Sequence, residues 1–289
     1  MIWHKYSPAI LTVLVFLLVQ GIGSVLLFAV GVIVSPEFGE AVRAFVSGKA
    51  QGLPFLELIP VSAFSIVTAV TDILAVLICY FLLHYIRFST AFNTSSIKLR
   101  PSLLAISGSI LGALSVSILT ESVELSDEMM QISVAMSHNF WGLLTVVFVG
   151  PIVEELLFRE AIEGEMLRRN VKPWIAILVS AIAFSVSHLN LAQGLYAFSL
   201  AILFGIIYYK TGNIILTSLL HILNNGFSAV QLYLYDEGIE DVSYADLFGG
   251  TLQSYTFMLL SGVISVALIT TFCKDNPSYD EFASENNNI

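Results

Sequence analysis

Apolar residues run through the chain in long segments that are separated by short polar loops. A helix needs about 20 consecutive apolar residues to cross the hydrocarbon core of a bilayer. By that rule the chain contains about eight candidate spans, at residues 9–34, 59–86, 102–120, 139–160, 173–190, 194–209, 213–235 and 252–273. The pattern therefore predicts an all-α fold, a polytopic membrane protein with about eight transmembrane helices.

Positive charge is distributed unequally between the two sets of loops that these spans define. An even number of crossings places both termini on one side, and every lysine and arginine except Arg43 and Lys49 falls on that side. Acidic residues collect in the opposite loops. Because loops rich in Lys and Arg tend to stay in the cytoplasm, we expect both termini to be cytoplasmic, and we interpret the membrane as a bacterial plasma membrane.

The composition agrees with a single membrane domain over residues 1–289. Hydrophobic residues make up 56% of the chain and charged residues 12%, whereas soluble domains carry about 25% charged residues. The formal net charge of -10 resides in the loops, so it gives no sign of a nucleic-acid partner, and we expect none. Residues 274–289 are predicted to form a polar cytoplasmic tail.

Three polar clusters interrupt the apolar segments, and each contains an ionisable residue. They are Glu154-Glu155 followed by Arg159, then Phe184 followed by His188, and then His221 followed by Asn225. An ionisable side chain at membrane depth costs about 3 kcal/mol on insertion scales, so it normally faces the interior of a helix bundle or a wet cavity. We therefore expect the three clusters to share one site.

Helix geometry assigns different environments to the two adjacent glutamates. Neighbouring residues on a helix diverge by about 100 degrees, whereas residues four apart share a face. We therefore expect Arg159 to neutralise Glu155, and Glu154 alone to face a cavity. For the pair by itself, an ion pair among the cytoplasmic lipid headgroups is an alternative interpretation.

The same residues form a candidate hydrolytic site. A carboxylate and an imidazole around one water can act as a general base, a role that Glu154 and His188 fit. His221 and Asn225 can donate hydrogen bonds to a developing oxyanion. Alternatively, Glu154, His188 and His221 could bind a divalent metal such as zinc and leave one position for water. The contiguous HExxH motif is absent, so the sequence leaves open whether the cofactor is a metal or none.

The ordered motifs EExxxR, FxxxH and HxxxN resemble those of the CPBP family of intramembrane proteases, which includes type II CAAX prenyl endopeptidases and bacterial Abi proteins. The run from Gly205 to Asn213 is similar to the family's approach to its third motif. The resemblance covers a motif core at about residues 139–230. It implies an eight-helix fold whose cavity opens toward the cytoplasm.

The resemblance also implies an activity, namely intramembrane hydrolysis of a peptide bond in a peptide or a membrane-protein substrate. By motif position, Glu154 and His188 activate the water, His221 and Asn225 form the oxyanion site, and Glu155 and Arg159 support it. The alternative is a non-enzymatic transporter or peptide-immunity protein that uses buried charges for binding or for a proton path. For the enzyme, the lipid bilayer and the substrate are the expected partners.

Two further features of the spans bear on the site. Asp72 is an acid in the middle of the second span, where it either lines the cavity or pairs with a hydroxyl such as that of Thr71. At 1.5 Å per residue, straight helices would place Glu154 and His221 about 10 Å from the cytoplasmic side and His188 about 20 Å from it. We expect Gly150-Pro151 to kink the fourth span and reduce this difference.

Overall fold

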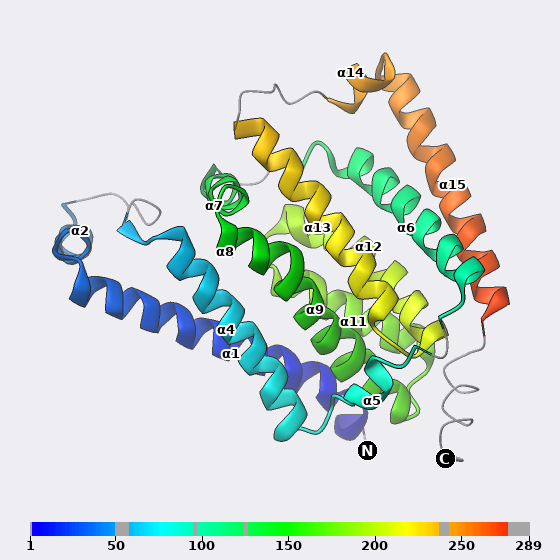
Figure 1. Cartoon of the computed structure of the whole chain (residues 1–289), viewed down its shortest axis with the longest axis horizontal. Helices are drawn as coiled ribbons and strands as arrows, with labels where there is room; N and C mark the ends of the chain where they lie inside the picture. Colours follow the sequence, from blue (N-terminus) through cyan, green and yellow to red (C-terminus); the bar gives the residue numbers. More distant parts are fainter. Residues whose placement is uncertain (1, 50–57, 95–96, 124–126, 237–242, 277–289) are drawn as a thin grey trace.

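The computed structural model describes residues 2–49, 58–94, 97–123, 127–236 and 243–276, and every regular element in these ranges is helical (Figure 1). The α-helices are α1 (Ile2–Val34), α2 (Pro36–Val46), α4 (Val61–Phe81), α5 (Phe88–Ala91), α6 (Leu99–Thr120), α7 (Asp127–Ser137), α8 (Phe140–Leu143), α9 (Gly150–Glu154), α10 (Glu165–Arg168), α11 (Pro173–Ser187), α12 (Leu191–Thr211), α13 (Ile215–Asp236), α14 (Tyr244–Phe248) and α15 (Thr251–Asp275). Two π-helical segments, η1 (Leu144–Val149) and η2 (Glu155–Gly164), join α8, α9 and α10 into one continuous helix. The predicted all-α fold is confirmed.

Each predicted span corresponds to a helix, but the helices differ in how well they suit a bilayer. In the described part of the chain, six helices are long and apolar enough to cross a membrane: α1, α4, α6, the continuous helix from α8 to α10, α12 and α15. Helix α11 has only 15 residues, and α13 carries a histidine and two asparagines. The polytopic membrane protein is confirmed, and the predicted number of eight spans is approximate.

The outer helices expose large apolar side chains, while charged side chains lie inside. Leu18 and Val25 of α1 are 61% and 67% exposed, and Val263 of α15 is 68% exposed. Glu155 and Arg159, in contrast, are fully buried. Extended apolar surface of this kind is unusual on a soluble monomer. It is what a bilayer requires, because the hydrocarbon covers the apolar side chains.

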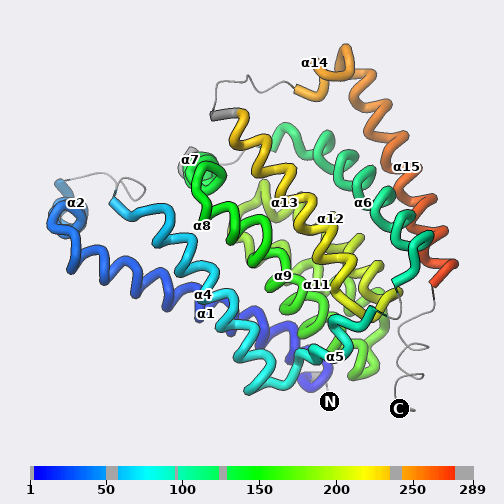
Figure 2. The backbone as a smooth tube through the Cα atoms, viewed as in Figure 1, coloured from blue at the N-terminus to red at the C-terminus, as the bar shows by residue number. Residues whose placement is uncertain are grey.

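Helices α1 and α4 lie side by side (Figure 2). A cluster of polar side chains joins them. The Thr71 hydroxyl donates to Gln20 Oε1 at 2.8 Å, and Gln20 Nε2 donates to Asp72 Oδ1. Gly23 faces Thr71, and a Cβ atom added there would collide with the threonine methyl group. Asp72 therefore has a structural partner on α1, since both Thr71 and Asp72 hold Gln20.

Helices α6 and α15 approach closely through small residues. Ser265 Oγ donates to the Gly108 carbonyl at 2.7 Å, and Ser115 Oγ donates to the Met258 carbonyl at 2.9 Å. A Cβ atom added to Gly108 would lie 2.9 Å from the Ile269 side chain. Small residues and interhelical hydrogen bonds are the usual means of holding membrane helices together. This pair forms one flank of the bundle (Figure 1).

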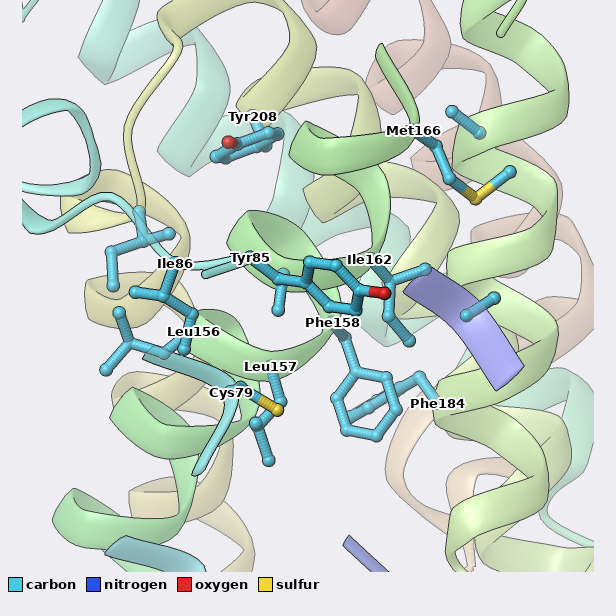
Figure 3. Packing of buried hydrophobic residues seen from close by; sticks show 14 of the residues in the cluster. Cys79, Tyr85, Ile86, Leu156, Leu157, Phe158, Ile162, Met166, Phe184 and Tyr208 are labelled. Atoms are coloured by element: carbon cyan, nitrogen blue, oxygen red, sulfur yellow. The ribbon is translucent and has the colours of Figure 1, made fainter. Parts of the chain in front are cut away.

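The hydrophobic core surrounds the segment η2 (Figure 3). Phe158 lies near its centre and packs edge-on against Phe184 of α11, with ring centroids 5.1 Å apart. Leu157 and Ile162 are also fully buried, as is Tyr208 of α12. Segment η2 is thus enclosed by neighbouring helices, which allows its polar side chains to be held away from lipid.

Both ends of the described chain lie at the same end of the bundle (Figure 2). There, Arg168 forms ion pairs with Glu160 and Glu165, each at 2.8 Å, and Arg169 pairs with Glu165 at 2.8 Å. Helix α15 continues to Asp275 and thus takes in the start of the predicted polar tail. The rest of that tail, residues 277–289, lies outside the described residues.

Among the glycines in the described residues, Gly142 lies closest to the backbone of another segment. A Cβ atom added there would lie 2.3 Å from the Met136 carbonyl oxygen, so α8 and the end of α7 could not keep their present separation. We expect Gly142→Ala to lower the free energy of unfolding by about 1–3 kcal/mol. Thermal unfolding in detergent measures the change. Gly21→Ala is the control, because no heavy atom lies within 4 Å of its added Cβ; equal melting temperatures for the two variants would contradict the expectation.

Candidate active site

A cavity of about 430 Å³ lies between α4, α9, α11, α12 and α13. Among the described helices, α9 packs against both α4 and α13, as Figure 1 shows. The cavity is lined by residues that the sequence analysis singled out, namely Asp72, Glu154, Phe184, His188, His221 and Asn225. Ionisable groups from four different helices therefore converge on one space. Of the two possibilities stated for Asp72, lining the cavity is what the structure shows, together with the contact to Gln20.

The His221 imidazole lies between the two adjacent glutamates. Its Nε2 is 3.4 Å from Glu154 Oε2, and its Nδ1 is 3.1 Å from Glu155 Oε1. Glu154 alone of the two glutamates lines the cavity, as expected, but the contact between Glu155 and the same imidazole was not expected. The two ring nitrogens point in different directions, so two divergent carboxylates can reach the same ring from two sides.

Glu155 is held by a buried ion pair with Arg159. The Arg159 Nε lies 3.2 Å from Glu155 Oε2, and neither side chain has any exposed area. The guanidinium also donates to Ser180 Oγ at 2.9 Å and lies over the Phe184 ring at 5.6 Å from its centroid. Burial of both charges excludes the alternative of an ion pair among lipid headgroups. The charge of Arg159 compensates Glu155, which in turn orients His221.

Glu154 differs from Glu155 in its access to the cavity. Its side chain is 24% exposed, whereas that of Glu155 is fully buried. A water molecule entering the cavity can therefore reach the Glu154 carboxylate. Glu154 contacts His221 and is also open to the cavity, whereas Glu155 is enclosed by His221 and Arg159.

His188 follows the last turn of α11, where it is half-buried. Its Nδ1 lies 2.8 Å from the Phe184 carbonyl and donates to it, because a carbonyl can only accept. This contact leaves Nε2 available to the cavity. Phe184 packs edge-on against His188 at 4.8 Å and against His221 at 5.7 Å. The Phe184 ring thus contacts both histidines and separates them at the cavity wall.

Asn225 reaches from α13 to the segment before the glutamates. Its Nδ2 donates to the Val146 carbonyl at 3.0 Å. Asn224, which the sequence analysis left out, also lines the cavity and donates to Asn225 Oδ1 at 3.2 Å. Asn224 Oδ1 in turn accepts a hydrogen bond from the hydroxyl of Tyr196, another lining residue that was not predicted. Two adjacent asparagines stand in a predicted apolar span, and this feature of the sequence could have identified the pair.

The predicted metal set does not form a metal-binding group in this arrangement. His221 Nδ1 contacts Glu155 and His188 Nδ1 contacts the Phe184 carbonyl, so only Nε2 of each ring could bind a metal. Contacts of this kind on the second ring nitrogen are also usual in metal-binding histidines. Among the described residues, however, no three His, Cys, Asp or Glu side chains are close enough to hold a metal ion.

The fold and the cavity define a polytopic all-α membrane protein with a buried polar site. Residues 136–227 match the family described as "Type II CAAX prenyl endopeptidase Rce1-like". The chain is also similar to the "Membrane-embedded CAAX protease MroQ" of Staphylococcus aureus (strain USA300), at 29% identity over 100 residues. That alignment spans 33% of this chain and 40% of the relative. No solved structure matches the chain.

These two similarities agree with the motifs from which the resemblance was predicted. The matched residues 136–227 include all three polar clusters, from Glu154 to Asn225. The resemblance to the CPBP and CAAX proteases is confirmed. The similarity resides in the part of the chain that builds the cavity.

The buried ion pair generates a test of stability. Removing one partner of a buried pair leaves an uncompensated charge and costs about 3–5 kcal/mol. We expect Arg159→Met to lower the free energy of unfolding by that amount, and Glu155→Gln in the same chain to restore most of it. Thermal unfolding of the two single variants and the double variant gives the coupling energy.

Arg100→Met is the matched control for Arg159→Met. The Arg100 side chain is 77% exposed and lies 3.4 Å from Asp275, so this pair is held in a more exposed setting. Exposed pairs contribute about 0–1 kcal/mol. A loss for Arg159→Met no larger than that for Arg100→Met would show that the buried pair is not a structural anchor.

Proposed function

We propose that the chain is an intramembrane endopeptidase in which Glu154 and His188 activate a water and His221 and Asn225 stabilise the oxyanion. The single observation that carries this proposal is the shared cavity, in which Glu154 lies 3.4 Å from a histidine that Glu155 holds on its other side. The similarity of residues 136–227 to CAAX proteases supports the reaction class.

The reaction begins with a water between Glu154 and His188. Glu154 takes a proton from the water, and His188 accepts a hydrogen bond from it through Nε2, because its Nδ1 carries the proton that it donates to Phe184. The oxygen of the water then attacks the carbonyl carbon of the peptide bond. A positioned general base of this kind contributes about 10²–10⁴ to the rate.

The negative charge that develops on the carbonyl oxygen needs hydrogen-bond donors. Asn225 supplies an amide N–H, and His221 supplies Nε2–H. Because Nδ1 of His221 also donates to Glu155, His221 must carry both ring protons to serve this role. Glu155 provides the counter-charge for that form, because Glu154 has taken the proton from the water by this stage. The tetrahedral intermediate collapses when the C–N bond breaks and Glu154 returns its proton to the leaving amine.

The cavity also suggests which substrates suit the site. Its lining is mainly apolar, and the ionisable groups among the described lining residues are Asp72, Glu154, His188 and His221, with no lysine or arginine. A neutral or basic segment of a peptide or membrane protein fits these charges. An acidic side chain next to the scissile bond would find no lysine or arginine among the described lining residues to pair with.

We further propose that residues 1–289 form one membrane domain whose motif core is at residues 139–230. Both ends of the described chain lie at one end of the bundle (Figure 2), which agrees with two cytoplasmic termini. The uneven distribution of basic residues supports this orientation in a bacterial plasma membrane.

Substitution of Glu154 tests the proposed function. The purified protein in detergent is incubated with a library of membrane-proximal peptides, with and without a chelator. We expect Glu154→Gln to lower the cleavage rate by at least about 10²-fold, because the amide cannot take the proton from water. Glu40→Gln on the exposed face of α2 is the control and should retain full activity.

The arms of this experiment separate the remaining possibilities. Cleavage by the wild type that persists with the chelator supports a glutamate-activated water, and loss of cleavage with the chelator supports a metal. Cleavage by Glu154→Gln at the wild-type rate contradicts the proposal. If no form cleaves any peptide and Glu154→Gln still supports function in cells, the non-enzymatic alternative is favoured.

Asp72 generates a prediction about substrate charge. A lysine ammonium beside the scissile bond can form an ion pair with the Asp72 carboxyl group, whereas a glutamate there cannot, so we expect peptides with lysine at that position to be cleaved at least roughly tenfold faster than those with glutamate. Asp72→Asn keeps an acceptor for Gln20 and should reduce this preference. The ratio of kcat/KM for the two peptides measures it, and an unchanged ratio in the variant would show that Asp72 does not contribute to specificity.

A further inference from the structure

An asparagine that stabilises an oxyanion must present its nitrogen to the substrate. The two ends of the amide have nearly the same shape, and a rotation of 180 degrees exchanges a donor for an acceptor. The direction of the Asn225 amide is therefore a functional requirement that packing alone does not meet. The hydrogen bonds around Asn225 determine this direction.

Pro151 explains why the Val146 carbonyl is available to accept a hydrogen bond from Asn225. Segment η1 has π-helical hydrogen bonds, and the Gly150 N–H donates to the Thr145 carbonyl, five residues earlier. In the same register, the carbonyl of Val146 would accept from residue 151, but proline has no N–H. The Val146 carbonyl is thus left without its helical partner. Asn225 Nδ2 donates to this carbonyl at 3.0 Å.

Starting at the Val146 carbonyl, each hydrogen bond determines which end of the next side-chain amide donates and which end accepts. Because Asn225 Nδ2 faces the carbonyl, its Oδ1 faces away and accepts from Asn224 Nδ2 at 3.2 Å. Asn224 Oδ1 then accepts from the Tyr196 hydroxyl at 2.7 Å. These hydrogen bonds run from α12 through α13 to η1.

We propose that Tyr196 and Asn224 are positioning residues that fix the Asn225 amide with its N–H groups toward the scissile carbonyl. This inference rests on the proposed function, since it concerns the donor to the oxyanion. Reversal of the Asn225 amide would bring its Oδ1 against the Val146 carbonyl and toward the oxyanion, so two acceptors would meet at each place. The donors on Tyr196 and Asn224 oppose that reversal.

Tyr196 and Asn224 lie at cavity walls, where a substitution can test their role without disturbing the packing of the hydrophobic core. Both line the catalytic cavity and a second, mainly apolar cavity of about 340 Å³ between α6, α12 and α13. They form the partition between the two cavities. Tyr196→Phe removes only the hydroxyl, so it leaves the partition in place while removing the first donor of the chain.

The test compares the cleavage kinetics of Tyr196→Phe and Asn224→Asp with the wild type. An aspartate at 224 cannot donate to Asn225 Oδ1 and instead attracts its Nδ2, so we expect kcat to fall toward the roughly 10²–10³-fold loss that follows removal of an oxyanion donor. Tyr196→Phe should give a smaller fall in kcat with KM unchanged, since the interaction acts in the transition state. Tyr255→Phe on the exposed face of α15 is the control for loss of a hydroxyl.

A merely structural role is distinguished by a double-variant cycle. In an Asn225→Ala background there is no amide to orient, so Tyr196→Phe should have no further effect on kcat. An additive effect in that background, or an unchanged kcat in both Tyr196→Phe and Asn224→Asp, overturns the inference. If Glu154→Gln cleaves like the wild type, or no form cleaves, the proposed function itself fails. If Glu154→Gln and Asn225→Ala are both inactive but Tyr196→Phe and Asn224→Asp are not impaired, only the positioning role fails.

Discussion

The buried ion pair between Glu155 and Arg159 is the interaction on which the polar interior depends. The two side chains meet at 3.2 Å with no exposed area, where either charge alone would be costly. Arg159 also binds Ser180 of α11, and Glu155 binds His221 of α13. One charge pair therefore connects η2 with the two helices that carry the histidines. Because Glu155 is fully occupied in this way, its neighbour Glu154 is left as the carboxylate that faces the cavity.

A second constraint comes from the irregular winding of the central helix. Segments η1 and η2 flank α9, so the helix that carries both glutamates departs from α-helical geometry on either side of Gly150-Pro151. π-Helical turns occur often at functional sites. Here the helix places two adjacent carboxylates at the two nitrogens of one imidazole, and η1 leaves the Val146 carbonyl for Asn225. Next to Pro151 the structure shows a change in hydrogen-bond register, which has consequences for side chains on α13.

Much of the fold could be predicted from the sequence, because apolar runs of membrane length have few alternatives to helices in a bilayer. The helices fall where the runs predicted them, although α11 has only 15 residues. The convergence of Glu154, His188 and His221 was predicted from the cost of burying ionisable groups, and all three line one cavity. The contact of Glu155 with His221 was not predicted, because the sequence argument did not consider that the two nitrogens of one imidazole can reach carboxylates on two faces of a helix. Tyr196 and Asn224 were missed because their importance depends on hydrogen bonds between helices, which no single segment reveals.

The central claim is that Glu154 activates a water that attacks a peptide bond. The most direct test is mass spectrometry of peptide products formed in H₂¹⁸O by the purified protein and by its Glu154→Gln variant. The account predicts that the wild type produces a peptide whose new carboxyl group contains one ¹⁸O atom, and that Glu154→Gln produces almost none. Equal labelled product from both proteins, or no hydrolysis by the wild type on any membrane-proximal peptide, would contradict the account.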